Sequence, residues 1–226
     1  MTLLEYMCKN VTLDRVKIMA RPLYIKLSAG WSACIFFAFL TAKIANAELH
    51  EQTAVFAGGC FWGVDAVFRH VKGVSEVVSG YTGGSMDTAN YKQVSEGNTG
   101  HAESVRVRFD PKQVSYQQLL QIFFKVVHDP TKRNRQGPDI GGQYRSAIFY
   151  TSIEQLDISK GYIQQLNALH IFPAPIVTQV VPLQQFYPAE DFQQNYYALH
   201  RYMGYIVATD KPKLNRLHKQ FPTLYK

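Results

Sequence analysis

Apolar and polar positions along the chain follow two different periods, which predicts strands that alternate with helices. Residues 53–57 form a short apolar run that reads as a strand and ends at two glycines. After these glycines, apolar residues recur at helical spacing at Val64, Val67, Phe68 and Val71. Residues 76–81 read as a second strand, and the following segment 82–101 is a loop rich in Gly, Asp, Asn and Ser.

Residues 103–109 alternate strictly between two chemically different faces, which predicts a third strand. Glu103 shares one face with three apolar residues, whereas the other face carries a serine and two arginines. The pattern therefore puts one carboxylate on the apolar side of a strand.

Two capping boxes, each a serine followed three residues later by a glutamine, begin at Ser115 and Ser152. They predict helices over residues 116–127 and 153–168. The segment between these helices, residues 128–143, is punctuated by glycines and prolines and is expected to be a loop.

The last predicted strands cover residues 144–150 and 176–183, and a helix with an apolar stripe is expected around Phe192, Tyr196 and Leu199. The resulting order is β-α-β-β-α-β-α-β plus a C-terminal helix. Such an order predicts an α/β (α+β) fold, a two-layer sandwich with a mixed β-sheet and a ferredoxin-like core.

The N-terminal segment, residues 1–47, has the pattern of a secretory signal peptide or leader. Its uncharged apolar run, residues 27–42, lies between two lysines, and small residues of the kind that signal peptidase reads follow at 45–47. Because the run is shorter than the roughly 20 apolar residues of a spanning helix, an uncleaved membrane anchor is the second reading. The sequence predicts an exported, periplasmic protein with a mature domain of residues 48–226.

Charge and cysteine content change once this leader is set aside. The formal net charge is +7, but six of the 24 basic and two of the 17 acidic residues lie in residues 1–47, which leaves +3 for the rest. No basic run is interleaved with aromatics, which argues against a nucleic-acid partner. Two of the three cysteines, Cys8 and Cys34, also lie in the leader, so Cys60 is an odd thiol and a candidate for reactivity.

Cys60 stands between a strand and a helix, where unpaired backbone N–H groups and the helix dipole are expected to favour the nucleophilic thiolate. Phe61 and Trp62 offer an apolar wall beside it, although by this spacing alone all three can equally be core residues. Glu103 is expected to have a raised pKa on its apolar strand face and to suit a general acid. The alternative is a strand-end glutamate that reaches water.

A series of motifs, taken together, resembles the A-class peptide methionine sulfoxide reductases. They run in the family's order over about 150 residues, from 53 to 203. The motifs are GGCFWG at 58–63, GYTGG at 80–84, GHAE at 100–103, HDP at 128–130, RQG with Asp139 at 135–139, QYRS at 143–146 and YPAED at 187–191. Asp65 and Gly142 depart from the usual glutamate and threonine, and no resolving cysteine follows Cys60 in residues 61–226.

This resemblance implies reduction of methionine S-sulfoxide, free or in peptides and proteins, and hence repair of oxidised proteins. Cys60 is implied to be the nucleophile that becomes a sulfenic acid, and Glu103 the acid that protonates the sulfoxide oxygen. Tyr91 and Tyr144 are implied to hydrogen-bond that oxygen, Asp139 to position the polar side of the site, and Phe61 with Trp62 to hold the substrate methyl.

The implied cofactor chemistry involves no metal and no bound organic cofactor. An external thiol, such as a thioredoxin-like protein or dithiothreitol in vitro, is expected to regenerate the enzyme, and the mature domain is expected to be a soluble monomer. His101, His128 and His200 have no zinc-like spacing with Cys60.

The implied roles also make chemical sense, since attack at a sulfoxide sulfur needs hydrogen-bond donors and a proton delivered to oxygen. Two other classes stay open at this point. A thiol peroxidase also passes through a sulfenic acid, and a binding module can use the same pocket without catalysis.

Overall fold

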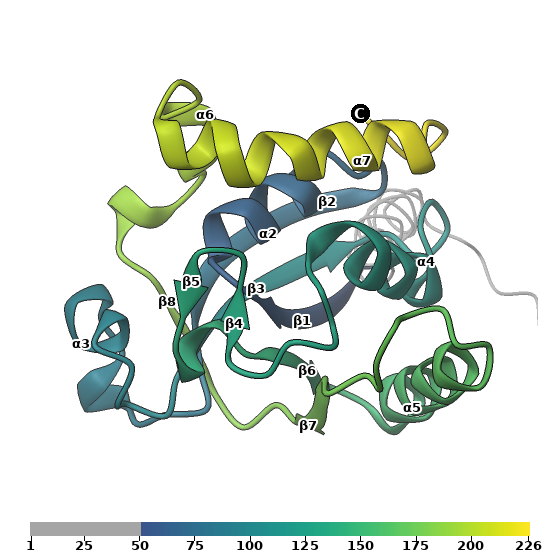
Figure 1. The fold of residues 1–226 in the computed structure, drawn as a ribbon, viewed down its shortest axis with the longest axis horizontal. Coiled ribbons are helices and arrows are strands. Elements are labelled where there is room, and N and C mark those ends of the chain that lie inside the picture. Colours follow the sequence, from purple (N-terminus) through teal and green to yellow (C-terminus); the bar gives the residue numbers. More distant parts are fainter. Residues whose placement is uncertain (1–50) are drawn as a thin grey trace, which may run out of the picture. The chain divides into compact units, whose positions relative to one another are not determined.

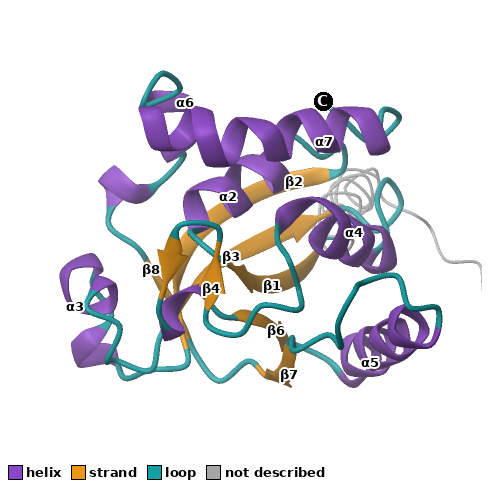
Figure 2. Ribbon diagram, in the orientation of Figure 1, coloured by secondary structure: helices purple, strands orange, loops and turns teal. Residues whose placement is uncertain are grey.

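A mixed six-stranded sheet in the order β7-β6-β1-β3-β2-β8 forms the centre of the described part of the chain, residues 51–226 of a computed structural model (Figures 1 and 2). Its strands are β1 Gln52–Gly58, β2 Val74–Thr82, β3 Ala102–Phe109, β6 Ser146–Tyr150, β7 Gln179–Pro182 and β8 Phe186–Pro188. Neighbouring strands are antiparallel except β6 and β7, which are parallel. The α/β class and the mixed sheet are confirmed, whereas the predicted leader lies outside the described residues.

Helices connect and cover these strands. They are α2 Phe61–Arg69, α3 Tyr91–Ser95, α4 Tyr116–Ile122, α5 Ile153–Ala168, α6 Tyr196–Leu199 and α7 Lys211–Gln220. Helix α2 packs against β1, β2 and β3, and α7 packs on the outer side of α2 (Figure 1). Among the described residues, no helix is both long and apolar enough to cross a membrane.

Serine caps begin both predicted long helices. Ser115 forms the full capping box with Gln118, and α4 continues into a π-helical turn, Phe123–Val127. The Ser152 side chain accepts the backbone N–H of Gln155, but the Gln155 amide contacts Thr151 and Thr53 instead of completing the box. The local signals therefore predicted where both helices start.

The main apolar core lies between the sheet and helices α2 and α4. Phe56 of β1 is fully buried, and its ring stacks on Phe68 at 5.2 Å and on Phe123 at 5.0 Å. The apolar face predicted for β3 is confirmed, because its two valines and Phe109 have no exposed surface. Burying each such side chain stabilises the fold by about 1.5–3 kcal/mol, so this core fixes β3 and α2 relative to each other.

Several elements differ from the sequence prediction. The helix expected around Phe192, Tyr196 and Leu199 is present only as the four-residue α6, which holds Tyr196 and Leu199, while Phe192 lies in a separate 3-10 turn, Asp191–Gln193. The expected buried apolar stripe is wrong, because Phe192 and Leu199 are 60% and 68% exposed. Asn195, with φ of 51°, interrupts the helix between them.

Short elements inside the predicted loops were also missed. The loop at 128–143 contains a hairpin of β4 Arg135–Gln136 and β5 Asp139–Ile140, and the loop at 82–101 contains α3. Tyr144 ends a 3-10 turn, Gly142–Tyr144, immediately before β6 instead of lying in that strand. Strand β8 and helix α7 had no prediction.

Candidate active site

The strand-to-helix junction presents Cys60 at the N-cap of α2. Gly59 precedes it with φ of 91°, a conformation that favours glycine. A Cβ atom on Gly59 would lie 2.8 Å from Cβ of Gln136, so the neighbouring hairpin also requires a glycine here. The Cys60 side chain is 7% exposed and is a free thiol.

Glu103 lies on β3, next to the start of the helix that presents this thiol, and is 1% exposed. Its Oε2 atom accepts a hydrogen bond from the backbone N–H of Phe61 at 3.0 Å. Burial raises the pKa of Glu103 to about 8, although this N–H and the nearby Cys60 side chain act to lower it. The predicted raised pKa is confirmed, and at neutral pH the carboxyl is protonated in most molecules.

The pKa of Cys60 does not follow its prediction. Burial raises the pKa of the thiol well above its ordinary value, and the nearby Glu103 raises it further. The backbone N–H of Trp62 lowers it by a smaller amount. The helix dipole stabilises a thiolate by about 0.3–1 kcal/mol, which lowers the pKa by less than about one unit. Full burial raises the pKa of a thiol by as much as roughly 3–5 units. The resting thiol is therefore protonated.

Two phenol groups flank the thiol and the carboxyl. The pKa values of Tyr91 and Tyr144 are raised first by burial and then by the charges of Glu103 and Cys60, so both hydroxyls lie within electrostatic range of both groups. Glu190 holds Tyr91 in place, because its Oε1 atom accepts the backbone N–H of Tyr91 at 2.8 Å. Its other oxygen accepts the hydroxyl of Tyr81, also at 2.8 Å.

Asp139 of β5 is half-buried and lies within electrostatic range of Glu103. Its Oδ2 atom accepts a hydrogen bond from the Tyr205 hydroxyl at 2.6 Å, and burial raises the pKa of its carboxyl. The charge of Cys60 contributes to the raised pKa of Tyr205, so this phenol also lies within electrostatic range of the sulfur. Tyr205 was missed in the sequence, where neither a motif nor a periodic pattern marks it.

The two predicted apolar wall residues occupy different positions. Trp62 is half-buried, and its ring stacks on Tyr196 with centroids 3.8 Å apart and planes at 7°. Its Nε1 atom donates a hydrogen bond to Oε1 of Gln193 at 2.7 Å, which fixes the indole. Phe61 is fully buried and packs against Tyr81, so it supports the site from the core side.

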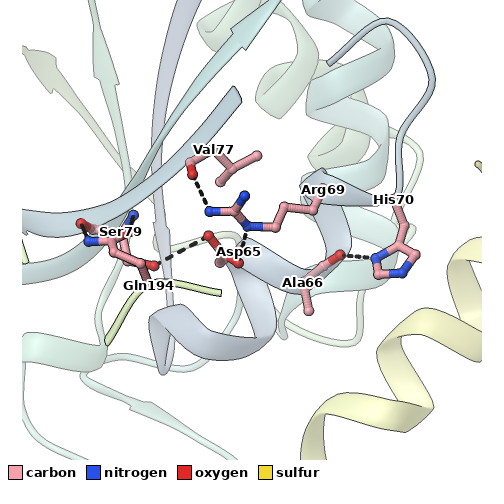
Figure 3. A network of polar contacts seen from close by, with 7 residues as sticks. All are labelled: Asp65, Ala66, Arg69, His70, Val77, Ser79 and Gln194. Atoms are coloured by element: carbon pink, nitrogen blue, oxygen red, sulfur yellow. Dashed lines mark hydrogen bonds and ion pairs between the residues drawn. The ribbon is translucent and has the colours of Figure 1, made fainter. Parts of the chain in front are cut away.

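A polar network around Asp65 and Arg69 of α2 fixes this helix against β2 (Figure 3). Asp65 is 1% exposed and pairs with Arg69 at 2.7 Å, and Arg69 in turn donates to the carbonyl of Val77. Ser79 donates to Asp65, and the side chain of Gln194 bonds both the N–H and the carbonyl of Ser79. The network therefore anchors both α2 and the segment that carries Gln193.

The three histidines considered as metal ligands have other partners. His128 has a pKa lowered to about 3 by burial, and its Nε2 atom lies 2.7 Å from Oγ of Ser146. The ring of His101 bridges the 84–85 backbone, and His200 stacks on a tyrosine ring. Residues 51–226 contain no group of three or more His, Cys, Asp or Glu that could hold a metal ion.

Comparisons with known proteins agree with this geometry. The family described as "Peptide methionine sulfoxide reductase" matches residues 52–224. Peptide methionine sulfoxide reductase MsrA 2 of Mesorhizobium japonicum is 53% identical over 175 residues, which cover 77% of this chain and 90% of that protein. The MsrA 2 protein of Synechocystis is 50% identical over 170 residues, covering 75% of this chain and 79% of that protein.

Solved structures show the same fold. Methionine sulfoxide reductase A of Corynebacterium diphtheriae has a TM-score of 0.59 at 32% identity and covers 67% of this chain and 76% of that chain. Reduced Mxr1 of Saccharomyces cerevisiae has a TM-score of 0.64 at 30% identity and covers 68% of this chain and 88% of that chain. The chain therefore belongs to the peptide methionine sulfoxide reductase family and is a peptide-methionine (S)-S-oxide reductase of the A class.

Proposed function

We propose that Cys60 attacks the sulfur of methionine sulfoxide while Glu103 protonates the sulfoxide oxygen. One observation carries this assignment: the buried Glu103 carboxyl accepts the backbone N–H of Phe61, the residue after Cys60, at 3.0 Å, and burial keeps it mostly protonated at neutral pH. As the proton of Glu103 moves to the sulfoxide oxygen, the thiol proton can move to Glu103. Oxygen is transferred to Cys60, which becomes a sulfenic acid, and the substrate sulfur is reduced to a thioether.

The surrounding side chains supply the rest of the site in this proposal. The hydroxyls of Tyr91 and Tyr144 donate hydrogen bonds to the sulfoxide oxygen, whose negative charge grows as its bond to sulfur breaks. Asp139 orients the polar side of the site through Tyr205. The methyl group of the substrate has no polar handle, so the Trp62 ring, supported from the core by Phe61, selects it by apolar contact.

Family membership also decides between the functions that the residue pattern left open. The reductase function is favoured over both alternatives, a thiol peroxidase and a pocket that only binds oxidised methionine. We propose that its substrates include methionine sulfoxide both free and in oxidised proteins, so that the enzyme repairs proteins.

Regeneration of Cys60 is proposed to depend on an external thiol. A sulfenic acid normally condenses with a neighbouring thiol, and residues 61–226 contain no cysteine. A small thiol or a thioredoxin-like protein would attack the oxidised sulfur to give a mixed disulfide, which a second thiol then resolves. Turnover should therefore rise with the concentration of the reductant.

A single-turnover experiment tests this route. Reduced enzyme mixed with excess methionine sulfoxide and no reductant should yield about one methionine per enzyme and lose one thiol. Mass spectrometry should then find one added oxygen at Cys60. The same experiment on Cys8→Ser/Cys34→Ser is the matched control and should give the same stoichiometry. An internal disulfide in the unsubstituted chain that is absent from the control would instead identify a leader cysteine as the resolving thiol.

We further propose that residues 1–47 are a signal peptide and that residues 48–226 act as a soluble monomer in the periplasm. The support is the uncharged run at 27–42 and the small residues at 45–47. Expression of the full chain in a bacterium with a periplasm should give a mature protein that begins at Glu48. N-terminal sequencing checks this result, and an intact leader on a soluble cytosolic protein would contradict it.

The fold supports a finer assignment, which we also propose. Strands β6, β1, β3 and β2 follow one another in the sheet, and α2 and α4 form the crossovers of two interleaved β-α-β units. This order is that of a ferredoxin-like core in a two-layer sandwich.

A further inference from the structure

A buried ion pair that the proposed reaction does not use lies against the first turn of α2. Asp210 ends a π-helical turn, Ile206–Asp210, and has no exposed surface. Its Oδ1 atom accepts a hydrogen bond from Nζ of Lys213 at 3.0 Å, and the Lys213 side chain is 14% exposed. Water screens such charges less than it screens charges on the surface.

Gly63 shows how close this pair is to the nucleophile. A Cβ atom at Gly63 would overlap both Oδ1 of Asp210 and Nζ of Lys213, so only glycine leaves room for the two charges. Gly63 lies three residues after Cys60, within the helical turn that Cys60 caps. The ion pair therefore borders the turn that presents the sulfur.

The charged and titratable groups within electrostatic range of Cys60 come from several elements, and Lys213 is the cation of this set. They are Glu103 on β3, Tyr91 on α3, Tyr144 before β6, Tyr205 and Asp210 before α7, and Lys213 on α7, with Asp139 hydrogen-bonded to Tyr205. Asp210 raises the pKa of the thiol and Lys213 lowers it, while burial and Glu103 raise it. Without a cation, the negative charge on the attacking sulfur would face carboxyl and phenol groups.

We propose that Lys213 is a positioning residue whose ammonium stabilises the negative charge that develops on Cys60, and that Asp210, which pairs with this ammonium beside the first turn of α2, partly offsets the effect. The inference rests on the proposed role of Cys60 as the nucleophile. It assigns opposite effects to the two members of one ion pair: Lys213 favours the thiolate, and Asp210 limits that effect. If the pair only stabilised the fold, its two members would not have opposite effects on thiolate formation at Cys60.

The test measures the rate of Cys60 alkylation by iodoacetamide against pH in the full chain that carries Cys8→Ser and Cys34→Ser. Lys213→Met should raise the midpoint by about one unit, which lowers the thiolate fraction at neutral pH about tenfold. Asp210→Asn should lower the midpoint, and Lys213→Arg should restore it. Lys219→Met, an exposed position on the same helix, is the matched control and should leave it unchanged.

Shifts of Lys213→Met and Asp210→Asn in the same direction, or no shift in either, would overturn the proposal. If Lys213→Met does not fold because Asp210 is left buried without its cation, the double variant Lys213→Met/Asp210→Asn removes both charges and is compared with Asp210→Asn. A higher midpoint in the double variant supports the proposal, and an equal or lower midpoint overturns it. Alkylation needs no turnover, so the test remains informative even if activity survives in Cys60→Ser. Activity in Cys60→Ser would reject the proposed function, whereas the measured effect of the ion pair on the Cys60 thiol would still stand.

Discussion

Cys60→Ser is expected to lower reduction of methionine sulfoxide on the order of 10⁴-fold or more, the scale on which removing a nucleophile acts. A serine hydroxyl has nearly the same size, but it is far less nucleophilic and cannot take up oxygen as a sulfenic acid. The Glu103 carboxyl and both site tyrosines remain in the variant, so the loss isolates the sulfur. Initial rates with free methionine sulfoxide, at saturating dithiothreitol, measure the effect.

The same chemical change at Cys34 provides a matched control in the same chain. Cys34→Ser should keep the normal rate, and circular dichroism should show that both variants are folded. Substantial turnover by folded Cys60→Ser would mean that another group reduces the sulfoxide.

Glu103→Gln should cost roughly 10²–10⁴-fold in rate, the usual contribution of a general acid. The amide keeps the shape of the side chain and can still accept the N–H of Phe61, but it cannot deliver a proton to the sulfoxide oxygen. Because the pKa of Glu103 is raised to about 8, kcat/KM of the unsubstituted enzyme should also fall as the pH rises through that value. The variant should lack this decline, and an unchanged rate at neutral pH would show that the acid lies elsewhere.

Stability gives a second readout of the same carboxyl. A pKa raised from its ordinary value of 4.5 to about 8 means that the folded state holds the proton more tightly than the unfolded state. The stabilisation from this proton is complete below pH 4.5 and is lost as the pH rises through about 8. Glu103→Gln should therefore lose less thermal stability than the unsubstituted chain between pH 7 and 9. A variant that is inactive but keeps more of its thermal stability at pH 9 has lost catalysis and not its fold.

Local sequence signals predicted the first half of the fold well, because each element there has its own boundary signal. Two glycines end β1, a serine cap begins α4, and strict alternation marks the buried face of β3. The same reasoning failed at Phe192 and Leu199, since helical spacing does not reveal the left-handed backbone at Asn195. Strands of two residues, such as those of the 135–140 hairpin, are too short to show any period.

The residues of the site also divide into those that the sequence predicted and those that it did not. Cys60 and Glu103 each stand at a position whose local pattern already indicates chemistry. Tyr205 donates a hydrogen bond to Asp139, 66 residues away in the sequence, and Glu190 holds Tyr91 across 99 residues, so the roles of Tyr205 and Glu190 appear only after folding. The protonated resting thiol also depends on how much of the chain covers it, which the sequence does not show.

The stacked position of Trp62 gives the enzyme an optical property. The chain has two tryptophans, and the other, Trp31, belongs to the proposed leader, so fluorescence of the mature domain would come from this single indole. Its emission reports contact with the Tyr196 ring and with water at the place where the substrate methyl is proposed to bind. Binding of the sulfoxide and release of methionine change the environment of this indole. Stopped-flow fluorescence can therefore time each step of the cycle without a label.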